Sequence, residues 1–359
     1  MNMSTDEFFL KRALNLSKKG LSWTNPNPLV GAVIVKNNSI IGQGFHHQAG
    51  LPHAEIEALN SLKVDAKGAT IYINLEPCAH FGKTPPCAEA IIQSGIKKVV
   101  CSSLDPNPKV NGKGIVKLQR AGIKTFVGIL EKEARKLNET FFTFHERKRP
   151  FIAIKFAASL DGKMATSGGD SKWITCESAR KYARTLREAY QAVLVGVNTV
   201  TLDNPNLGVR MKGKKDPIRI ILDPKLRIPL KSQVLRDTNV IIATTTRADK
   251  AKKEHLESLG FRVLVFNSNH ITIPQFLSVL RVNEIISVLV EGGGKTLGNF
   301  VDSGIIDKVY AFHAPTLIGG SRAVSIGGIG TATIEKAIRL KNISYKRFDD
   351  NFLTIGYVN

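Results

Sequence analysis

Short apolar runs alternate with amphipathic stretches along the first part of the chain. The opening stretch is apolar on one face, which predicts a helix that Gly20 ends. A polar turn at 36–38 separates two β-branched runs and predicts a hairpin of strands 29–35 and 39–45. This alternation is typical of an α/β domain with mostly parallel strands. The pattern further predicts helices over 52–62, 86–94 and 115–121, strands over 70–75 and 97–102, and one more strand after Gly122.

A stretch rich in Lys, Arg and Glu at 131–150 predicts an exposed helix and a hinge that ends at Pro150. We therefore expect two domains, 1–148 and 149–359. The α/β alternation resumes beyond the hinge, and the sequence contains no internal repeat. It predicts strands over 151–157, 192–196, 218–223, 239–244, 263–266 and 285–290, and helices over 178–189, 249–259 and 274–280. Two closing strand segments, 308–315 and 348–358, are expected to add antiparallel edges.

The composition is that of an ordinary globular protein, apart from its charge. Hydrophobic residues make up 43% and charged residues 23% of the 359 residues, which excludes a disordered, collagen-like or low-complexity chain and favours two domains. Lys and Arg outnumber Asp and Glu by 51 to 30, and this net charge of +21 invites a polyanionic partner. Because the excess is spread over both expected domains, we expect a few cations to meet phosphates and no specific nucleic-acid partner.

The start of the chain lacks the features of a secretory signal. Asp6 and Glu7 stand where a signal peptide carries positive charge, and no apolar run approaches the roughly 18 residues of a membrane span. The 4 cysteines are too few for a disulfide scaffold and indicate a reducing compartment. We therefore expect a cytoplasmic protein without a membrane partner.

Three potential metal ligands stand where two predicted helices begin. His53 opens one helix, whereas Cys78 and Cys87 each follow a proline and flank an insert of eight residues before the next helix. One imidazole and two thiolates suit zinc, and three protein ligands leave the fourth position for water, which is the catalytic pattern. Zinc lowers the pKa of that water toward neutrality. The spacing therefore predicts a catalytic zinc site, with thiolates favoured by the helix N-termini.

Glu55 stands beside these ligands without being one of them. We expect it to take the proton of the water and pass it to a leaving group. Because residues two apart face nearly opposite sides of a helix, His53 is expected in the first turn, just inside Pro52, where it points along the axis. The other cysteines, Cys101 and Cys176, are interpreted as structural.

The second expected domain contains a polar loop and a glycine run. A strand over 151–157 leads into the loop up to Thr175, and a second strand ends at Val290, before Glu291, Gly292–Gly294 and a helix. Backbone N–H groups at such a helix N-terminus suit a dinucleotide pyrophosphate, although the spacing differs from the GxGxxG fingerprint. The hydroxyl-rich segment Thr244–Arg247, expected after a strand end, is a further hypothesis, for the 2′-phosphate that distinguishes NADPH from NADH.

Several segments resemble known families. His53-Ala54-Glu55 with LEPCAHFGKTPPC at 75–87 resembles the zinc-dependent cytidine and nucleotide deaminases, in the branch of riboflavin biosynthesis. KFAASLDGKMA, SKWIT, VLVGVNTVTLDNP and LVEGGGKTLGNF follow in this order and resemble the reductase half of the bifunctional riboflavin-biosynthesis deaminase/reductase family. The resemblance covers nearly the whole chain. It implies a cytidine-deaminase-like α/β/α domain over 1–148 and a dihydrofolate-reductase-like α/β domain over 149–359.

The same resemblance assigns roles to residues of both domains. In the first domain it implies that Asn27 and Lys83 contact the substrate, and it makes His46, Asp105 and Asn107 further candidates. In the second it implies substrate binding by Ser171, Arg187, Leu207, Arg210 and Glu291. The two arginines suit a phosphate because a guanidinium forms bidentate hydrogen bonds. NADP is expected at Ala157, Trp173, Thr199, Asp203, Gly293, Gly294, Lys295, Thr296, Leu297, Gly298 and Asn299.

The resemblance implies one zinc ion per chain, NADPH, a homo-oligomer and two consecutive reactions. The first is the zinc-dependent hydrolytic deamination of 2,5-diamino-6-(5-phosphoribosylamino)pyrimidin-4-one, and the second is the reduction of its ribosyl side chain to ribityl with a hydride from NADPH. No residue stands out as the general acid of the second reaction.

Two alternatives stay open. A tRNA-adenosine or other nucleotide deaminase with an appended domain is favoured by the basic composition and disfavoured by the eight-residue insert between Cys78 and Cys87. A nucleic-acid-binding protein with a structural zinc is disfavoured because only three ligands group together and aromatic residues are sparse.

Overall fold

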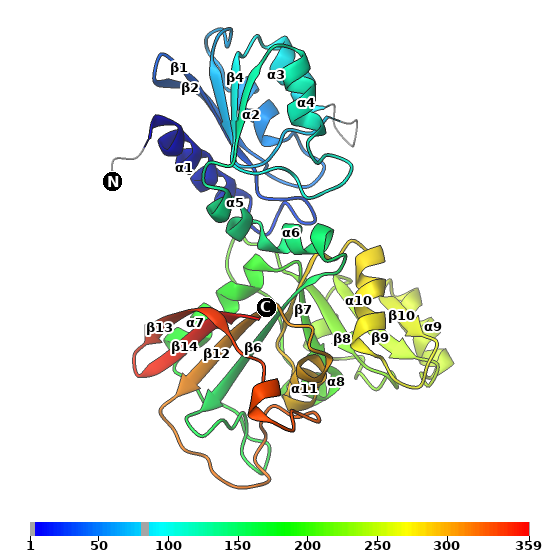
Figure 1. The fold of residues 1–359 in the computed structure, drawn as a ribbon. Coiled ribbons are helices and arrows are strands. Elements are labelled where there is room, and N and C mark those ends of the chain that lie inside the picture. The colour runs from blue at the N-terminus through cyan, green and yellow to red at the C-terminus, as the bar shows by residue number, and fades with distance from the viewer. Residues whose placement is uncertain (1–3, 80–85, 359) are drawn as a thin grey trace. The chain divides into compact units, whose positions relative to one another are not determined.

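The computed structural model describes residues 4–79 and 86–358. The chain divides into two compact units, Met1–Lys148 and Arg149–Asn359, each with its own sheet (Figure 1). Among the described residues, no helix combines the length and the apolar character that crossing a membrane requires.

The first unit is built on a five-stranded sheet with the order β2-β1-β3-β4-β5. The expected hairpin is present, and its first strand also pairs antiparallel with β3, whereas β3, β4 and β5 run parallel to one another. The first unit therefore contains two antiparallel and two parallel pairings. The strands are β1 (Gly31–Lys36), β2 (Ser39–Phe45), β3 (Thr70–Ile73), β4 (Lys98–Cys101) and β5 (Lys124–Val127).

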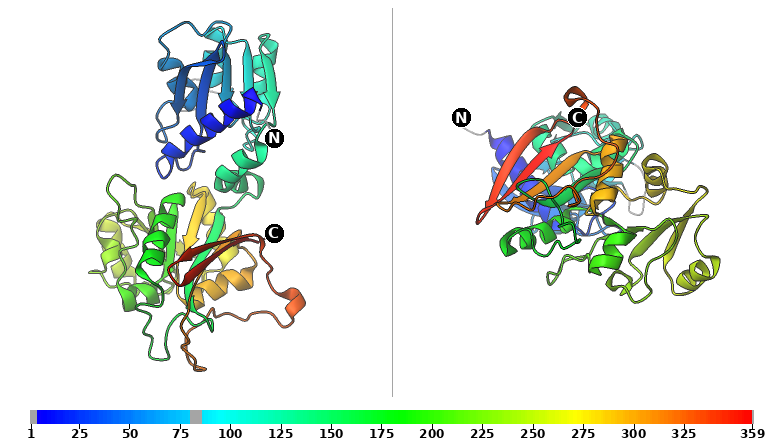
Figure 2. Two further views of the ribbon diagram at one scale, coloured as in Figure 1. Left: turned by 90° about the vertical axis from the view of Figure 1, so that its left-hand side faces the viewer. Right: turned by 90° about the horizontal axis from the view of Figure 1, so that it is seen from below.

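Helices cover both faces of this sheet. On one face, α1 packs Phe9, Leu10 and Ala13 against the strands, and Figure 2 shows this helix in dark blue lying across the sheet. On the other face, α2, α3 and α4 contribute Ala58, Ile91 and Leu118 to a second core. Because side chains alternate along each strand, one sheet supplies both cores. The helices are α1 (Thr5–Ser17), α2 (Ala54–Asn60), α3 (Cys87–Gln93), α4 (Lys113–Arg120), α5 (Glu131–Leu137) and α6 (Glu139–Glu146).

The end of the first unit differs from the exposed helix expected over 131–150. Two short helices, α5 and α6, meet at Asn138, whose side chain is buried and hydrogen-bonds both the N–H and the carbonyl of Leu29. Phe141 and Phe142 of α6 are buried beside Leu75. The prediction of an exposed helix was wrong here. Charged residues dominate the composition of the segment, so the burial of its two phenylalanines could not be read from that composition.

The second unit is built on a nine-stranded sheet with the order β10-β9-β8-β7-β11-β6-β12-β14-β13. The first seven strands in this order are parallel, and β14 and β13 close the sheet as an antiparallel hairpin, drawn in red at one edge in Figure 2. Both expected closing strands are present, but only the second is antiparallel to its neighbours: the strand from 308–315 pairs parallel with β6 inside the sheet, and β13 forms the edge. The strands are β6 (Phe151–Ser159), β7 (Ala192–Gly196), β8 (Ile218–Leu222), β9 (Val240–Thr245), β10 (Arg262–Phe266), β11 (Ser287–Val290), β12 (Lys308–Ala314), β13 (Lys341–Phe348) and β14 (Asn351–Tyr357).

Helices also cover both faces of the second sheet. Phe276 of α10 and Phe300 of α11 pack in the core of one face. Ala183 of α7, Val200 of α8 and Leu256 of α9 pack on the other face. The parallel strands are thus buried on both sides, as crossover connections require. The helices are α7 (Glu177–Leu186), α8 (Val197–Asp203), α9 (Lys250–Ser258), α10 (Ile273–Val282) and α11 (Gly294–Ser303).

Two elements of the second unit were not predicted. Helix α8 has only seven residues and buries only Val197 and Val200, which is too short for a periodic signal. Strand β13 is exposed along nearly its whole length, so its sequence KNISYKRF lacks the apolar and polar alternation of a half-buried strand.

Candidate functional site

The three predicted metal ligands of the first unit meet in space. His53 precedes α2, Cys78 lies in the loop after β3, and Cys87 is the first residue of α3. Their ligand atoms all lie within 4.8 Å of one another. His53 Nδ1 lies 3.7 Å from the sulfur of Cys78 and 3.3 Å from that of Cys87. The site thus forms where the carboxyl end of β3 and the N-termini of two helices converge.

These distances fit a zinc ion. Zinc bonds of about 2.3 Å to sulfur and 2.0–2.1 Å to nitrogen at tetrahedral angles separate such ligand atoms by roughly 3.6 Å. The two observed nitrogen–sulfur separations, 3.3 Å and 3.7 Å, lie on either side of this value. An imidazole with two thiols is also the donor set that zinc prefers.

His53 occupies a position different from the one expected. It is the N-cap residue of α2, with extended backbone angles, rather than a residue of the first turn inside Pro52. The extended backbone directs the imidazole toward the two sulfurs without a helical turn. This position removes the geometric conflict between His53 and Glu55, because only Glu55 is a helical residue.

Backbone hydrogen bonding supports a thiolate at Cys78. The N–H of Cys87 donates to the Cys78 sulfur at 3.3 Å, from the first position of α3. The thiol of Cys87, and after it the imidazole of His53, lower the pKa of Cys78 below its ordinary value. A low thiol pKa is what a metal-ligating cysteine at a helix N-terminus requires.

Glu55 is buried beside the ligands. Its side chain lies in the first turn of α2, is only 3% exposed, and contacts the thiol of Cys87. Burial raises the pKa of Glu55 to about 7. A carboxyl group with a pKa near neutrality exchanges protons readily in both directions, as a general acid–base catalyst must.

Asn27 and His46 extend the site beyond the ligands. The amide of Asn27 donates to Nε2 of His46 at 3.1 Å, and Nδ1 of His46 donates to the carbonyl of Pro52 at 3.0 Å. The ring of His46 meets that of His53 edge to face, with centroids 5.3 Å apart. His46 therefore holds Asn27 near the metal ligands, and burial lowers the pKa of His46.

The other predicted substrate contacts of this unit are Asp105, Asn107 and Lys83. Asp105 is buried, and burial raises its pKa to about 7; its carboxylate accepts the N–H of Asn107 at 2.7 Å. Asn107 thus occupies a turn that its own backbone and Asp105 fix. Lys83 lies outside the described residues.

Glu76 is a residue of this site that sequence reasoning missed. Its buried carboxylate accepts backbone N–H groups of Asp105 and Gly112 through Oε2, at 3.2 and 2.9 Å, and of Gly114 and Ile115 through Oε1, at 2.9 and 3.2 Å. The last two open helix α4. Glu76 thereby fastens the loop that carries Cys78 to the segment 105–115. The only signal in the sequence is its place two residues before a ligand.

In the second unit, the predicted substrate residues Arg187 and Glu291 form a buried ion pair. Nε of Arg187 lies 2.7 Å from Oε1, and Nη2 lies 3.0 Å from Oε2 of Glu291. The remaining nitrogen, Nη1, donates to the carbonyl of Gly208 at 2.8 Å. The pair joins the end of β11 to the loop 204–217, which carries Leu207 and Arg210.

The glycine run after β11 has two kinds of environment. A side chain at Gly294 would lie 2.1 Å from the carbonyl of Ser325, and one at Gly298 would lie 2.3 Å from the backbone of Gly327, so both positions are glycine because the chain itself packs there. Gly293 has ordinary space near Thr199 and precedes α11, whose N-terminus has no side-chain cap. Backbone N–H groups at this N-terminus can therefore meet a phosphate.

The remaining predicted cofactor residues come from several elements of the second unit and differ in exposure. Asp203 at the end of α8 lies 3.7 Å from Lys172, next to Ser171 and Trp173. The guanidinium of Arg180 stacks on the exposed ring of Trp173. Ala157 is half-buried on β6, Lys295 and Asn299 are exposed, and Thr296 and Leu297 are buried.

The predicted hydroxyl cluster at 244–247 is wrong in part. Thr244 and Thr245 belong to β9 and are fully buried, and the hydroxyl of Thr245 donates to the carbonyl of Pro224 at 2.7 Å. Because both side chains are buried in the parallel sheet, they are not accessible to a cofactor phosphate. Only Thr246 and Arg247 extend past the strand end, and both are exposed.

A surface pocket of about 410 Å³ lies at the loop 204–217, whose Gly208 accepts the hydrogen bond from Arg187. It is lined by Asn206, Arg210, Met211, Lys214, Asp216 and Arg236. Burial and the neighbouring cations Arg187, Arg184 and Arg236 lower the pKa of Arg210. A pocket with this charge suits an anionic group.

Both units match known families. Residues 3–103 match the cytidine and deoxycytidylate deaminase zinc-binding region, and residues 150–354 match the RibD C-terminal domain. The chain is 47% identical to the riboflavin biosynthesis protein RibD of Aquifex aeolicus over 94% of both chains. It is 43% identical to the RibD of Actinobacillus pleuropneumoniae, with 99% of this chain and 95% of the relative covered.

Solved structures resemble the whole chain. Acinetobacter baumannii RibD superposes with a TM-score of 0.90 at 37% identity, and the match covers 99% of both chains. A diaminohydroxyphosphoribosylaminopyrimidine deaminase/5-amino-6-(5-phosphoribosylamino)uracil reductase of Thermotoga maritima gives a TM-score of 0.87 at 39% identity, again over 99% of both chains.

Proposed function

The chain belongs to the RibD family of bifunctional riboflavin biosynthesis proteins, and from this premise we propose which of its residues carry the two reactions. The expected resemblance and the two enzyme activities, deaminase and reductase, are confirmed. Membership over nearly the full length favours this function over the alternatives of a tRNA-adenosine deaminase and a nucleic-acid-binding protein.

The expected fold class is also confirmed. The first unit has a cytidine-deaminase-like sheet covered by helices on both faces, and the second has the α/β sheet of the RibD reductase domain, of dihydrofolate-reductase type. We assign residues 1–148 to deamination and residues 149–359 to reduction, as expected from the sequence.

For the deaminase, the observation that carries the proposal is the meeting of His53, Cys78 and Cys87 beside buried Glu55. Zinc held by these three side chains supplies a Lewis acid that makes water nucleophilic at neutral pH. Glu55 accepts the proton of the attacking water and returns it to the departing amino group. Asn27, held by His46, orients the pyrimidine.

The substrate that fits this unit is an aminopyrimidine with a phosphoribosylamino side chain, 2,5-diamino-6-(5-phosphoribosylamino)pyrimidin-4-one. Lys83, which lies outside the described residues, remains a proposed contact to its phosphate. Hydrolysis replaces the amino group by oxygen and releases ammonia.

For the reductase, we assign NADPH to the N-terminus of α11 and the residues around it. Support comes from the uncapped N–H groups after Gly293, from Thr199 beside it, and from the exposed ring of Trp173. The remaining proposed contacts are Ala157, Asp203, Gly294, Lys295, Thr296, Leu297, Gly298 and Asn299. When bound, NADPH supplies a hydride to the sugar carbon that bears the amine.

The substrate of this second reaction is assigned to Ser171, Arg187, Leu207, Arg210 and Glu291. Arg210 in the surface pocket meets the phosphate, because it is an exposed cation that forms no ion pair with the residues described, 4–79 and 86–358. Arg187 and Glu291, fixed as a pair, shape the sugar-binding side.

Assembly and location are further parts of the proposal. We infer a homo-oligomer from family membership, and a reducing, cytoplasmic setting from the four unpaired cysteines, two of which must stay reduced to bind zinc. The excess positive charge, +21 in total, contributes at most weak and salt-sensitive RNA binding.

The purified zinc-loaded protein tests both halves of the proposal. Supplied with the phosphorylated diaminopyrimidine, it is expected to release ammonia and then to oxidise NADPH. Absence of ammonia release overturns the deaminase assignment. Absence of NADPH oxidation when the deaminated product is supplied directly overturns the reductase assignment.

The same assay tests cofactor selection. NADH in place of NADPH is expected to support slower reduction, and Arg247→Ala is expected to narrow the difference between the two cofactors. An unchanged preference in this variant contradicts a role of Arg247 at the 2′-phosphate.

A further inference from the structure

The segment Asn206–Arg210 has a backbone that its side chains do not favour. Leu207 and Arg210 both adopt left-handed angles, with φ of 59° and 57°. For residues other than glycine, this conformation is strained, because Cβ approaches the following carbonyl oxygen. The segment therefore keeps its shape only if its surroundings fix it.

Apolar burial fixes the segment from one side. Leu207 and Val209 are buried, at 2% and 0% exposure, and Leu207 packs in the core formed by α8, β7 and β9. The side chains of Leu207 and Val209 are thus buried, whereas that of Arg210 is exposed at the surface pocket.

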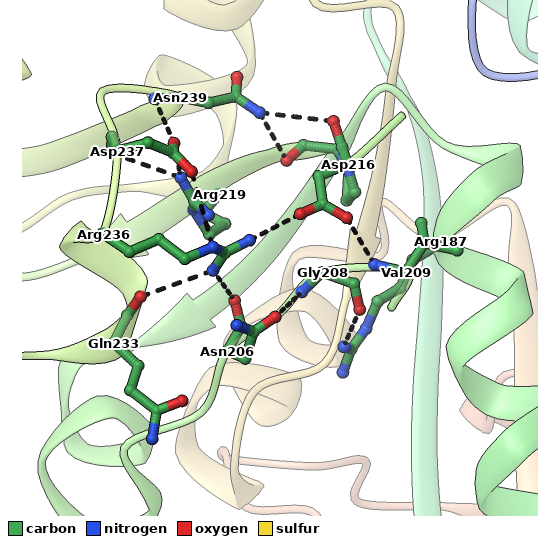
Figure 3. Close-up of polar contacts among 11 residues, drawn as sticks. Arg187, Asn206, Gly208, Val209, Asp216, Arg219, Gln233, Arg236, Asp237 and Asn239 are labelled. Atoms are coloured by element: carbon green, nitrogen blue, oxygen red, sulfur yellow. Dashed lines mark hydrogen bonds and ion pairs between the residues drawn. The ribbon is translucent and has the colours of Figure 1, made fainter. Parts of the chain in front are cut away.

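A polar network fixes the segment from the other side (Figure 3). Oδ1 of Asp216 accepts the N–H of Val209 at 2.8 Å, while Oδ2 accepts Nη2 of Arg236 at 2.7 Å. Nη1 of Arg236 donates to the carbonyl of Asn206 at 2.5 Å. One guanidinium thus binds both the first residue of the segment and the carboxylate that holds its fourth residue.

Gly208 closes this arrangement. Its N–H donates to the side chain of Asn206 at 3.0 Å, and its carbonyl accepts Nη1 of Arg187. A side chain at this position would lie 2.6 Å from Oδ2 of Asp216, so the carboxylate rests directly against the glycine backbone. The segment is therefore clamped between Arg187 and the Asp216–Arg236 pair.

The base of the clamp is itself anchored. Arg236 follows the short helical turn Gln233–Leu235, and the N–H of Gln233 donates to the side chain of Asn204 at 2.8 Å. The amide of Asn239 donates to the carbonyl of Pro217 at 3.1 Å, next to Asp216. The residues that carry Arg236 and Asp216 thus have contacts of their own outside the Asn206–Arg210 segment.

We propose that Arg236 and Asp216 are positioning residues of the reductase: they hold the Asn206–Arg210 segment in the left-handed shape that presents Arg210 to a phosphorylated substrate, with Leu207 as its buried anchor. The inference rests on the assignment of Arg210 to the substrate phosphate in the proposed function. Neither Arg236 nor Asp216 needs to touch the substrate for this role.

The fork of the guanidinium is essential to the arrangement. Two separate nitrogens of Arg236 bind two acceptors, the Asn206 carbonyl and Asp216, at the same time. A lysine at this position retains the charge but has a single nitrogen, so it cannot reproduce both bonds in this geometry. Arg236→Lys therefore separates the effect of geometry from that of charge.

The test compares kinetic constants of the reductase reaction in Arg236→Ala, Arg236→Lys and Asp216→Asn. We expect the KM for the phosphorylated, deaminated substrate to rise about tenfold in all three variants, with kcat changed less than threefold. The KM for the same compound without its phosphate is expected to stay within twofold. The double variant is expected to resemble the single ones, because both residues act on one segment.

Two controls accompany these variants. Arg262→Ala removes one exposed cation at the start of β10, whose side chain forms no hydrogen bond or ion pair with the other described residues, and its KM is expected to match the wild type. The deaminase activity of each preparation reports whether the first unit is intact. If Arg236→Ala unfolds, Arg236→Lys and Asp216→Asn decide the question.

The outcomes distinguish this inference from the proposed function. A wild-type protein that does not oxidise NADPH contradicts the proposed function itself. A wild-type protein that does so, with an unchanged KM in Asp216→Asn and Arg236→Lys, overturns the positioning role. An equal rise in KM for the phosphorylated and unphosphorylated compounds also overturns it, because a general loosening of the unit produces that result.

Discussion

The guanidinium of Arg187 binds both carboxylate oxygens of Glu291, at 2.7 Å and 3.0 Å, and the two side chains are only 12% and 8% exposed. Such a pair is costly to break from one side, since the remaining charge stays buried without its partner.

Glu291→Ala is therefore expected to lower the free energy of unfolding by about 3 kcal/mol. Glu291→Gln retains the shape and part of the hydrogen bonding and is expected to cost less. Urea unfolding followed by circular dichroism measures both values. A loss below 1 kcal/mol in Glu291→Ala contradicts the buried pairing.

The pair also predicts a pH dependence. Burial alone raises the pKa of Glu291, but the charge and hydrogen bonds of Arg187 outweigh it and hold the pKa below its ordinary value of 4.5. The stabilisation is therefore complete above pH 4.5 and is lost as the pH falls through the lowered pKa. The stability difference between the wild type and Glu291→Gln is expected to shrink in that acidic range, and a constant difference contradicts the assignment.

Glu55→Gln tests the proton transfer of the deaminase. The amide has the size of the carboxyl group but accepts no proton, so we expect kcat for ammonia release to fall by about 10²–10⁴. Zinc content and NADPH oxidation with deaminated substrate are expected to stay unchanged. Glu57→Gln is the matched control. Glu57 lies on the same helix, and its carboxylate lies 3.8 Å from Nε2 of His47, which is not a metal ligand. Ammonia release at the wild-type rate in Glu55→Gln contradicts the role.

Removal of the metal separates the two activities. A chelator is expected to abolish ammonia release while leaving NADPH oxidation with deaminated substrate intact, because the three ligands all belong to the first unit. Cys87→Ser is expected to have the same effect, with less than one zinc bound per chain, whereas Cys176→Ser in the second unit is expected to retain both the metal and the activity. Metal analysis of the purified variants measures this difference, and full zinc content in Cys87→Ser contradicts the ligand set.

Two neighbouring glycines give a matched comparison. Gly294→Ala places a methyl group 2.1 Å from the Ser325 carbonyl, so the free energy of unfolding is expected to fall by about 1–3 kcal/mol. Gly293→Ala meets only Thr199, at 3.7 Å, and is expected to change stability by less than about 0.5 kcal/mol. Equal stabilities of the two variants contradict the packing described for Gly294.

The zinc ligands could be predicted because each is marked locally in the sequence. His53 begins a helix, and Cys78 and Cys87 each follow a proline at a strand–helix junction, so the chemistry and the position are visible together. Glu76 carries no such mark. Its partners are backbone N–H groups of residues 105–115. Because every residue other than proline has such a group, the sequence does not indicate which ones Glu76 binds.

The reductase side shows a second limit of sequence reasoning. Without the family resemblance, the pattern around Arg187 predicts an exposed helix face. In the structure Arg187 is largely buried, because it pairs with Glu291, which lies 104 residues further along the chain. Arg236 was not predicted for the same reason, because its two acceptors come from the loop 204–217. Pairing over such sequence distances is set by the order of strands in the sheet.

Asn138 has a consequence for dissecting the molecule. Its amide closes two hydrogen bonds with Leu29, at 2.8 and 2.9 Å, two residues from the proposed pyrimidine contact Asn27. A deaminase fragment cut at the charged stretch near residue 131 therefore loses the side chain that supports the backbone next to Asn27. A separately expressed deaminase has to extend through α6, and a reductase fragment has to begin at Arg149, whose guanidinium binds Asp307 within the second unit.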